Sequence, residues 1–192
     1  MDKILRYESI EQDDITRAVS STFDYDFTGV SECQVPTLEK LPTDFSIGLI
    51  VGPSGSGKSS MLRLFGEETE PTWHKNKAIV SHFDSPEDAQ DKLSAVGLNS
   101  IPAWFRPYSI LSTGEKYRAN LARQLGDNVV VDEFTSVVDR SVAKSCSSAL
   151  SRYIRTSNIH SVVFASCHYD IIEWLEPDWV YDTLTRDFLP RR

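Results

Sequence analysis

The sequence predicts an α/β protein built around a mostly parallel sheet. Two observations carry this prediction. Short segments that are apolar almost throughout alternate with segments that have the apolar period of an amphipathic helix, as expected for strands covered on both faces. One apolar segment also leads through a glycine-rich turn directly into a helix. A chain of 192 residues is long enough to form a single domain over residues 1–192 with its own core.

The first 20 residues are predicted to form a peripheral helical segment. Ser9 and Gln12 have the spacing of a capping box, and an apolar stripe follows them. The next segment, 23–27, alternates Phe, Asp, Tyr, Asp and Phe, which is typical of a half-buried strand. An antiparallel β portion is therefore expected near the N-terminus.

The rest of the chain supplies the alternating elements in order. The predicted strands cover residues 45–51, 78–81, 129–131, 162–165 and 179–181. The predicted helices cover residues 59–66, 86–96, 115–125 and 142–154. Helical patterns dominate between about 84 and 125, so this part is expected to form a helical subdomain beside the sheet.

Composition excludes several classes of protein. The chain has 28 acidic and 20 basic residues and a formal charge of −8, so a surface that is basic all over, as in many nucleic-acid-binding proteins, is excluded. Its three cysteines are odd in number and form no CxxC pair, which indicates neither a disulfide framework nor a zinc site. No apolar run reaches the roughly 18 residues of a membrane span. A cytoplasmic protein without direct membrane insertion is expected, and nucleic acid could bind only through a local patch.

The glycine-rich turn has the pattern G-x-x-x-x-G-K-S, and it lies where that pattern binds phosphate, directly after a strand and at the start of a helix. Glycine lets backbone N–H groups approach phosphate oxygens closely, and the helix N-terminus adds a positive dipole. Lys58 is expected to contact the β- and γ-phosphates, and the Ser59 hydroxyl to hold Mg²⁺. The candidate phosphate-binding residues are Gly52, Pro53, Ser54, Gly55, Ser56, Gly57, Lys58, Ser59 and Ser60.

A second candidate lies about 70 residues further along the chain. An apolar strand over 129–131 ends in Asp132 and Glu133. Asp132 is expected to help coordinate Mg²⁺, and Glu133 to polarise the attacking water as a general base. Buried strands often end in solvated acids, so this pair gains its meaning from the phosphate loop upstream.

Three further motifs, in order along the chain, closely resemble those of the ABC-type ATPases. Residues 111–115 read Leu-Ser-Thr-Gly-Glu and resemble the signature motif; residues 136–139 read Ser-Val-Val-Asp and resemble the D-loop; His168 resembles the switch histidine. The resemblance implies a P-loop NTPase sheet of the ABC-ATPase type. It also implies an ATP-dependent dimer in which Mg²⁺ and ATP lie between the phosphate loop of one subunit and Ser112 and Gly114 of the other, with Asp139 and His168 close to the nucleotide.

Each of these smaller motifs also has a structural interpretation. Ser112 and Glu115 have capping-box spacing, and Asp139 precedes a predicted helix that it could cap. A single histidine such as His168 is often structural. His74 and His160 have no comparable placement and are expected at the surface.

Departures from the family pattern bear on its function. Where the family carries a glutamine that touches Mg²⁺ or the water, alignment places His82, so His82 is a candidate metal ligand. Thr113 and Glu115 stand where many members have Gly and Gln. The span between Lys58 and Ser112 is shorter than in transporter members, so the helical subdomain is expected to be reduced. A member that does not serve transport is favoured.

The adenine base is expected to stack on an aromatic side chain upstream of the phosphate loop. Tyr25 is the candidate, with Phe23 and Phe27 as rivals, and all three could instead pack a core.

Residues 132–140 together with 167–170 resemble a small group of soluble ABC-type ATPases often joined to an acetyltransferase domain. The resemblance implies that an acetyltransferase partner, if there is one, is a separate protein. The favoured function is Mg²⁺-dependent ATP hydrolysis coupled to dimerisation. The alternatives are a slow-turnover dimerisation switch, an ATP-binding subunit of a membrane transporter, and a DNA-repair ATPase, although no heptads for a coiled coil occur.

Overall fold

The computed structural model describes residues 4–35, 38 and 40–192. It divides into two compact units, Met1–Lys40 and Leu41–Arg192. Each unit is described by itself below.

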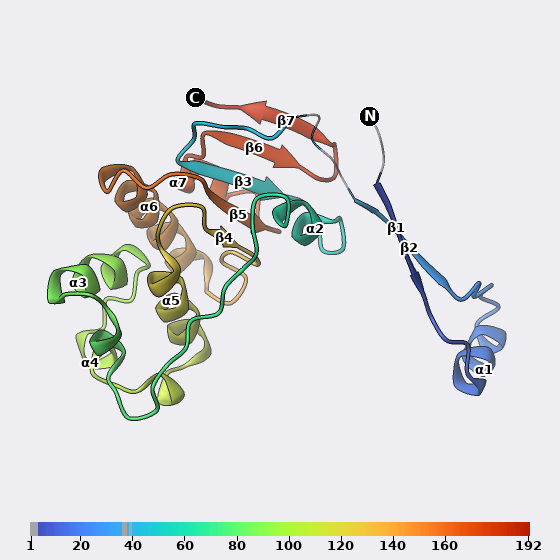
Figure 1. Cartoon of the computed structure of the whole chain (residues 1–192), viewed down its shortest axis with the longest axis horizontal. Helices are drawn as coiled ribbons and strands as arrows, with labels where there is room; N and C mark the ends of the chain where they lie inside the picture. Colours follow the sequence, from blue (N-terminus) through green and yellow to red (C-terminus); the bar gives the residue numbers. More distant parts are fainter. Residues whose placement is uncertain (1–3, 36–37, 39) are drawn as a thin grey trace. The chain divides into compact units, whose positions relative to one another are not determined.

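The first unit is a two-stranded antiparallel sheet, and one helix lies in the connection that joins its strands (Figure 1). Strand β1 (Ile4–Ser9) pairs with β2 (Val30–Val35), and helix α1 spans Asp14–Thr22. The prediction of an antiparallel β portion near the N-terminus is confirmed. The prediction of a helical segment over the first 20 residues is wrong at its start, where Ile4–Ser9 form strand β1. The predicted capping box of Ser9 and Gln12 is also wrong. Asp13 caps the helix instead, because its Oδ1 accepts the Thr16 N–H at 2.8 Å.

The strand predicted over residues 23–27 is not present. The chain leaves α1 through tight turns in which Phe23 N–H bonds the Val19 carbonyl at 3.1 Å and Tyr25 N–H bonds the Ser20 carbonyl at 2.9 Å. Asp24 between them adopts a left-handed φ of 49°. These turns consume the backbone donors that a strand would need, so the alternating sequence does not become a strand.

The second unit contains a five-stranded sheet in the order β4-β5-β3-β6-β7. Its strands are β3 (Ile47–Val51), β4 (Val130–Val131), β5 (Val162–Ser166), β6 (Trp179–Asp182) and β7 (Asp187–Pro190). The first four pair in parallel, and β7 is antiparallel to β6. Every residue of β3 and β5 is buried, so both faces at the centre of the sheet are covered. The predicted mostly parallel α/β fold is confirmed.

Helices pack around this sheet and extend beyond it. They are α2 (Lys58–Leu62), α3 (Pro86–Ala95), α4 (Ile101–Trp104), α5 (Thr113–Gln124), α6 (Arg140–Thr156) and α7 (Ile171–Leu175), with 3₁₀ turns η1 (Ile79–His82) and η2 (Tyr108–Ile110). Helices α3 and α4 gather near α5 at one side of the unit, in the region predicted to be helical (Figure 1). Among the described residues no helix is both long enough and apolar enough to cross a bilayer.

The strand predicted over residues 78–81 is wrong. These residues form η1, and only Ala78 makes a bridge, to Pro107. Ile79 is fully buried, with its N–H bonded to the Arg106 carbonyl at 3.0 Å. A short apolar run fits a buried 3₁₀ turn as well as a strand, and here no neighbouring strand pairs with it.

Asp178 connects the amino end of β3 to neighbouring elements through hydrogen bonds and an ion pair. Its Oδ2 accepts the N–H groups of Ser46 at 2.8 Å and Ile47 at 2.9 Å, and its Oδ1 lies 3.0 Å from Arg155. Partial burial works to raise the pKa of this carboxyl, but the hydrogen bonds from Ile47 and Ser46 and the Arg155 charge outweigh it and hold the pKa below its usual value. The ionised form therefore stabilises the folded state.

We expect Asp178→Asn to lower the free energy of unfolding by about 2 kcal/mol at pH 7, because two backbone donors lose a charged acceptor. Since the folded pKa is depressed, this stabilisation is present above the unfolded pKa of about 3.9 and is lost as the pH falls through the folded value. Urea unfolding at pH 7 measures the loss of stability, and urea unfolding at pH 3 measures how much of that loss disappears when the carboxyl is protonated. Asp187→Asn, at an exposed position in β7, is the control. An equal loss of stability at both pH values would contradict the assigned role.

Candidate functional site

Three loops carrying candidate residues meet at one edge of the sheet. Strands β4, β5 and β3 are neighbours and run parallel, so their carboxyl ends lie at the same edge. The phosphate loop follows β3, Asp132 directly follows β4, and one residue separates His168 from the end of β5. In open parallel sheets this edge is where ligands bind. The topology therefore brings together segments that are more than 100 residues apart in the sequence.

The phosphate loop connects β3 to α2 and places Lys58 inward. Pro53, Ser54 and Gly55 are exposed, whereas Lys58 is buried, with its Nζ donating to the Pro53 carbonyl at 2.9 Å. Gly57 precedes α2 with a left-handed φ of 91°, a conformation that favours glycine. Ser59 is exposed and Ser60 half-buried in the first turn of α2. The loop folds around the Lys58 ammonium and presents its outer residues to solvent.

Gly52 is required by a side chain from the other end of the chain. A Cβ at this position would lie 1.9 Å from Thr183 Oγ1, so no larger residue fits. Thr183 is buried after β6, where its N–H and its hydroxyl both donate to the Val51 carbonyl, at 2.9 and 3.1 Å. The Thr183 and Ser56 hydroxyls are also hydrogen-bonded, at 2.5 Å. Thr183 thus supports the phosphate loop from beneath, and no motif in the sequence indicated it.

Ser59 and Asp132 line the same cavity. Both are expected to contact one magnesium ion, which requires them to lie close together. The cavity has a volume of about 300 Å³, and Glu67, Glu68 and Arg63 also line it. Glu68 Oε1 accepts the Asp132 N–H at 3.2 Å. A hydroxyl and carboxylates beside a phosphate loop are the oxygen ligands that suit Mg²⁺. Ser59 and Asp132 thus supply oxygen atoms of the kind that Mg²⁺ takes from a protein when phosphates complete its coordination.

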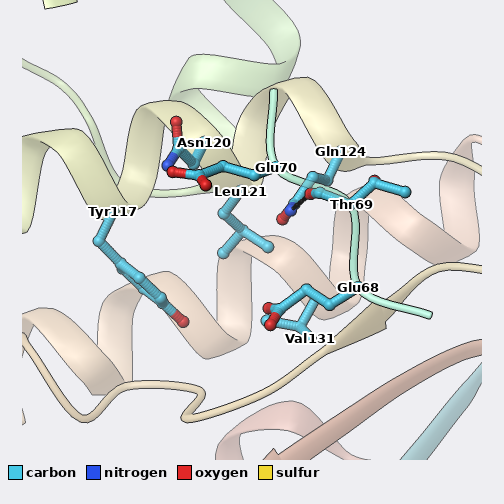
Figure 2. A pocket seen from close by; sticks show the side chains of 8 residues that line it. All are labelled: Glu68, Thr69, Glu70, Tyr117, Asn120, Leu121, Gln124 and Val131. Atoms are coloured by element: carbon cyan, nitrogen blue, oxygen red, sulfur yellow. Dashed lines mark hydrogen bonds between the residues drawn. The ribbon is translucent and has the colours of Figure 1, made fainter. Parts of the chain in front are cut away.

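Glu68 is a residue that the sequence did not single out, and it lines a second cavity as well. That cavity, of about 380 Å³, lies between the segment after α2, which carries Glu68 and Glu70, and helix α5, which carries Tyr117 and Asn120 (Figure 2). Partial burial raises the pKa of the Glu68 carboxyl, with smaller contributions from the charges of Asp132 and Glu70, and these outweigh the hydrogen bond from Asp132. A nearby cation would stabilise this carboxylate.

The turn after β4 presents Glu133 to solvent. Glu133 is exposed and has a left-handed φ of 49°, and its N–H donates to Asp132 Oδ1 at 2.8 Å. Two positions later, Thr135 is buried and also left-handed, with a φ of 69°, which is uncommon for a β-branched residue. Its N–H donates to the Tyr117 hydroxyl at 3.2 Å. This contact from α5 helps to hold an unfavourable backbone conformation in place.

The segment resembling the signature motif begins α5. Ser112 Oγ accepts the Glu115 N–H at 3.3 Å, and Glu115 Oε2 accepts the Ser112 N–H at 2.8 Å, which is the predicted capping box. These hydrogen bonds lower the pKa of Glu115. A Cβ on Gly114 would lie 3.6 Å from the Val137 carbonyl, so this motif and the segment resembling the D-loop are adjacent within one chain. Within the described part of the chain, the cavity of Ser59 and Asp132 is lined by none of residues 111–115.

Asp139 and His168 both have defined local roles. Asp139 caps α6, since its Oδ1 accepts the N–H groups of Ser141 and Val142, each at 3.0 Å. Hydrogen bonds from the Ser141 side chain and from Val142 lower its pKa. His168 is half-buried after β5, and its N–H donates to Ser166 Oγ at 3.1 Å. The predicted structural role of Asp139 is present, while contact of either residue with a nucleotide stays a prediction.

His82 and Tyr25 are two further candidates, one in each unit. Both ring nitrogens of His82 face backbone groups, with the His74 N–H at 3.0 Å from Nε2 and the Ala78 carbonyl at 2.9 Å from Nδ1, and the ring packs edge-on against Trp73. No ring nitrogen is free to bind a metal, so His82 is left out of the metal set. Tyr25 belongs to the first unit, where it is 66% exposed beside Phe23 and Phe27 in an apolar hollow. Its stacking on adenine remains a prediction.

Comparison with known proteins identifies the fold. No family model matches the chain. The chain is 28% identical to the Fe(3+) ions import ATP-binding protein FbpC of Yersinia enterocolitica, over 74% of this chain and 54% of that protein. The chain thus spans about half the length of this curated relative.

Two solved structures of the ATP-binding cassette MJ0796 have the same fold as this chain. The dimeric structure of this bacterial ABC transporter cassette is 14% identical, with a TM-score of 0.57, over 79% of this chain and 87% of that one. The dimeric post-hydrolysis structure bound to ADP and Pi is 13% identical, with a TM-score of 0.60, over 93% of this chain and 94% of that one. The fold is that of an ABC ATP-binding cassette, as the resemblance implied.

Proposed function

We propose that this chain binds ATP with Mg²⁺ and hydrolyses it to ADP and phosphate. One observation carries the proposal: the phosphate loop, with Lys58 buried inside it, leads into a helix whose Ser59 shares a cavity with Asp132. The likeness to cassettes, one of them bound to ADP and Pi, supports it.

Each residue has a distinct proposed role. Lys58 and the backbone N–H groups of the loop bind the β- and γ-phosphates, and Ser59 and Asp132 hold Mg²⁺, which neutralises phosphate charge. Glu133 orients and deprotonates the attacking water. His168 contacts the γ-phosphate. Glu68 helps to hold the backbone that carries Asp132, since its Oε1 accepts the Asp132 N–H.

The proposed assembly is an ATP-dependent homodimer. Within one chain, Ser112 and Gly114 lie outside the cavity of Ser59 and Asp132, yet α5 presents its N-terminus and the Ser112 hydroxyl toward solvent. A helix N-terminus is a good partner for a phosphate. In the dimer, these groups of one copy would contact the γ-phosphate bound by the other, completing a site that each chain forms only in part.

A second candidate function is the ATP-binding subunit of a transporter, which the likeness to FbpC favours. We favour a cytoplasmic, non-transport ATPase because the segment 63–112 between α2 and α5 is shorter than in transporter members, so the helical subdomain is small. Its partner would be a separate protein, such as an acetyltransferase, and turnover could be slow enough to act as a timer. Identifying the proteins that co-purify with the native chain, and whether they are membrane proteins, separates these functions.

The enzymatic part is tested by phosphate release from ATP by the purified wild-type chain, with Mg²⁺ and with chelator. The proposal expects turnover that requires Mg²⁺. Absence of Mg²⁺-dependent turnover, with ATP bound normally, would contradict it.

We expect Ser112→Arg to leave ATP binding within about threefold of wild type and to abolish ATP-dependent dimerisation. The large side chain occupies the surface where the partner copy's γ-phosphate is proposed to lie. Light scattering with ATP and Mg²⁺ measures dimerisation. Ser112→Ala removes the hydroxyl, and with it both the helix cap, at a cost of about 1 kcal/mol, and the proposed phosphate contact, but it does not fill the interface. Ser94→Arg places an arginine at an exposed position on α3. If Ser112→Arg still dimerises, the assigned interface is wrong.

A further inference from the structure

The turn that carries Glu133 and the loop that carries His168 are joined by one buried hydroxyl. Ser166, the last residue of β5, is fully buried. Its Oγ donates to the Phe134 carbonyl at 2.8 Å and accepts the His168 N–H at 3.1 Å. A hydroxyl can do both at once, and no apolar side chain of similar size can do either.

The same turn depends on this contact because its backbone is strained. Glu133 and Thr135, on either side of Phe134, both have left-handed φ angles. Phe134 between them is anchored to β5 twice, through its N–H to the Ala165 carbonyl at 2.8 Å and through its carbonyl to Ser166. The Phe134 ring is fully buried against Phe164, with ring centroids 4.5 Å apart. Residues in such conformations persist where their surroundings hold them.

We infer that Ser166 is a positioning residue that sets the places of Glu133 and His168 together. The inference rests on the proposed function, since it concerns the general base and the γ-phosphate contact of that reaction. Ser166 touches neither nucleotide nor water. It acts through the Phe134 carbonyl, one residue from Glu133, and through the backbone N–H of His168. Displacement of a catalytic group by about 1 Å lowers rates up to about 100-fold, whereas phosphate binding by Lys58 does not depend on this turn.

The test is a comparison of Ser166→Ala with the wild type and with Ser147→Ala. Ser147 is the matched control, because it is equally buried but its hydroxyl has no hydrogen-bond partner. We expect Ser166→Ala to lower kcat about 10- to 100-fold with the ATP Kd changed less than about twofold. Ser147→Ala should retain the wild-type kcat. Ser166→Thr keeps the hydroxyl and should recover most of the lost kcat, and it replaces the alanine variant as the test if that variant does not fold.

A double variant locates the effect. In the Glu133→Gln background the base is already absent and only the placement of His168 can still be lost, so adding Ser166→Ala should lower the residual rate by a smaller factor than it lowers the wild-type rate. A kcat for Ser166→Ala equal to that of Ser147→Ala would overturn the inference, as would a threonine variant that folds and is as slow as the alanine variant. An equal fold-loss in both backgrounds would overturn it too. If the wild type hydrolyses ATP and Ser166→Ala has the same kcat, only this inference is wrong. If the wild type does not hydrolyse ATP, the proposed function is wrong as well.

Discussion

Lys58→Ala is expected to weaken ATP binding at least about 100-fold, a loss of about 2.8 kcal/mol. The Lys58 ammonium is buried within the phosphate loop, 2.9 Å from the Pro53 carbonyl, and is the group proposed to meet the β- and γ-phosphates. Hydrogen bonds between a cation and phosphate are about twice as strong as neutral ones, and burial strengthens the attraction further. Titration with a fluorescent ATP analogue measures the change in Kd.

The control for this variant is Lys77→Ala, which removes an exposed lysine outside the loop. It should bind ATP as the wild type does. Circular dichroism establishes that Lys58→Ala remains folded, since the alanine leaves the Pro53 carbonyl without its lysine donor. Unchanged ATP affinity in a folded Lys58→Ala protein would show that this loop is not the phosphate site.

Glu133→Gln is expected to lower the rate of ATP hydrolysis by about 100- to 10,000-fold, the range typical for loss of a general base. The amide has nearly the same shape as the carboxylate but cannot accept the proton of the attacking water. Because Glu133 is exposed and lies outside the phosphate loop, ATP affinity should stay close to wild type. Phosphate release under single-turnover conditions measures the chemical step separately from product release.

Glu87→Gln, in the exposed first turn of α3, is the matched control and should hydrolyse ATP at the wild-type rate. A Glu133→Gln protein that retained more than half of the wild-type rate would exclude Glu133 as the base. Asp132 would then be the next candidate, because it lines the same cavity as Ser59.

Much of the second unit was predictable from local sequence, for identifiable reasons. Apolar strands buried on both faces give continuous apolar runs, so β3 and β5 stand out, and the glycine pattern after β3 has few alternative interpretations. The capping box of α5 depends on residues three apart, so it too can be read locally. The strand predictions for residues 78–81 and 23–27 were wrong, because the conformations of these segments depend on surrounding turns and bridges that short sequence patterns do not contain.

The candidate site was predictable only in part, because its support comes from distant residues. Ser59, Asp132 and Glu133 belong to motifs that the sequence displays. Thr183, by contrast, reaches Ser56 across 127 positions, and Glu68 meets Asp132 across 64. The pairing of β3 with β6 puts Thr183 beneath Gly52, and this pairing becomes known only with the sheet order.

Chromatography of Glu133→Gln with and without ATP and Mg²⁺ tests the central claim, that two copies share each nucleotide. Loss of the base leaves both halves of the site intact, so bound ATP should persist and hold the copies together. We expect a monomer without nucleotide and a stable dimer with it, containing two ATP molecules. A protein that binds ATP tightly yet elutes as a monomer at every concentration would contradict the account.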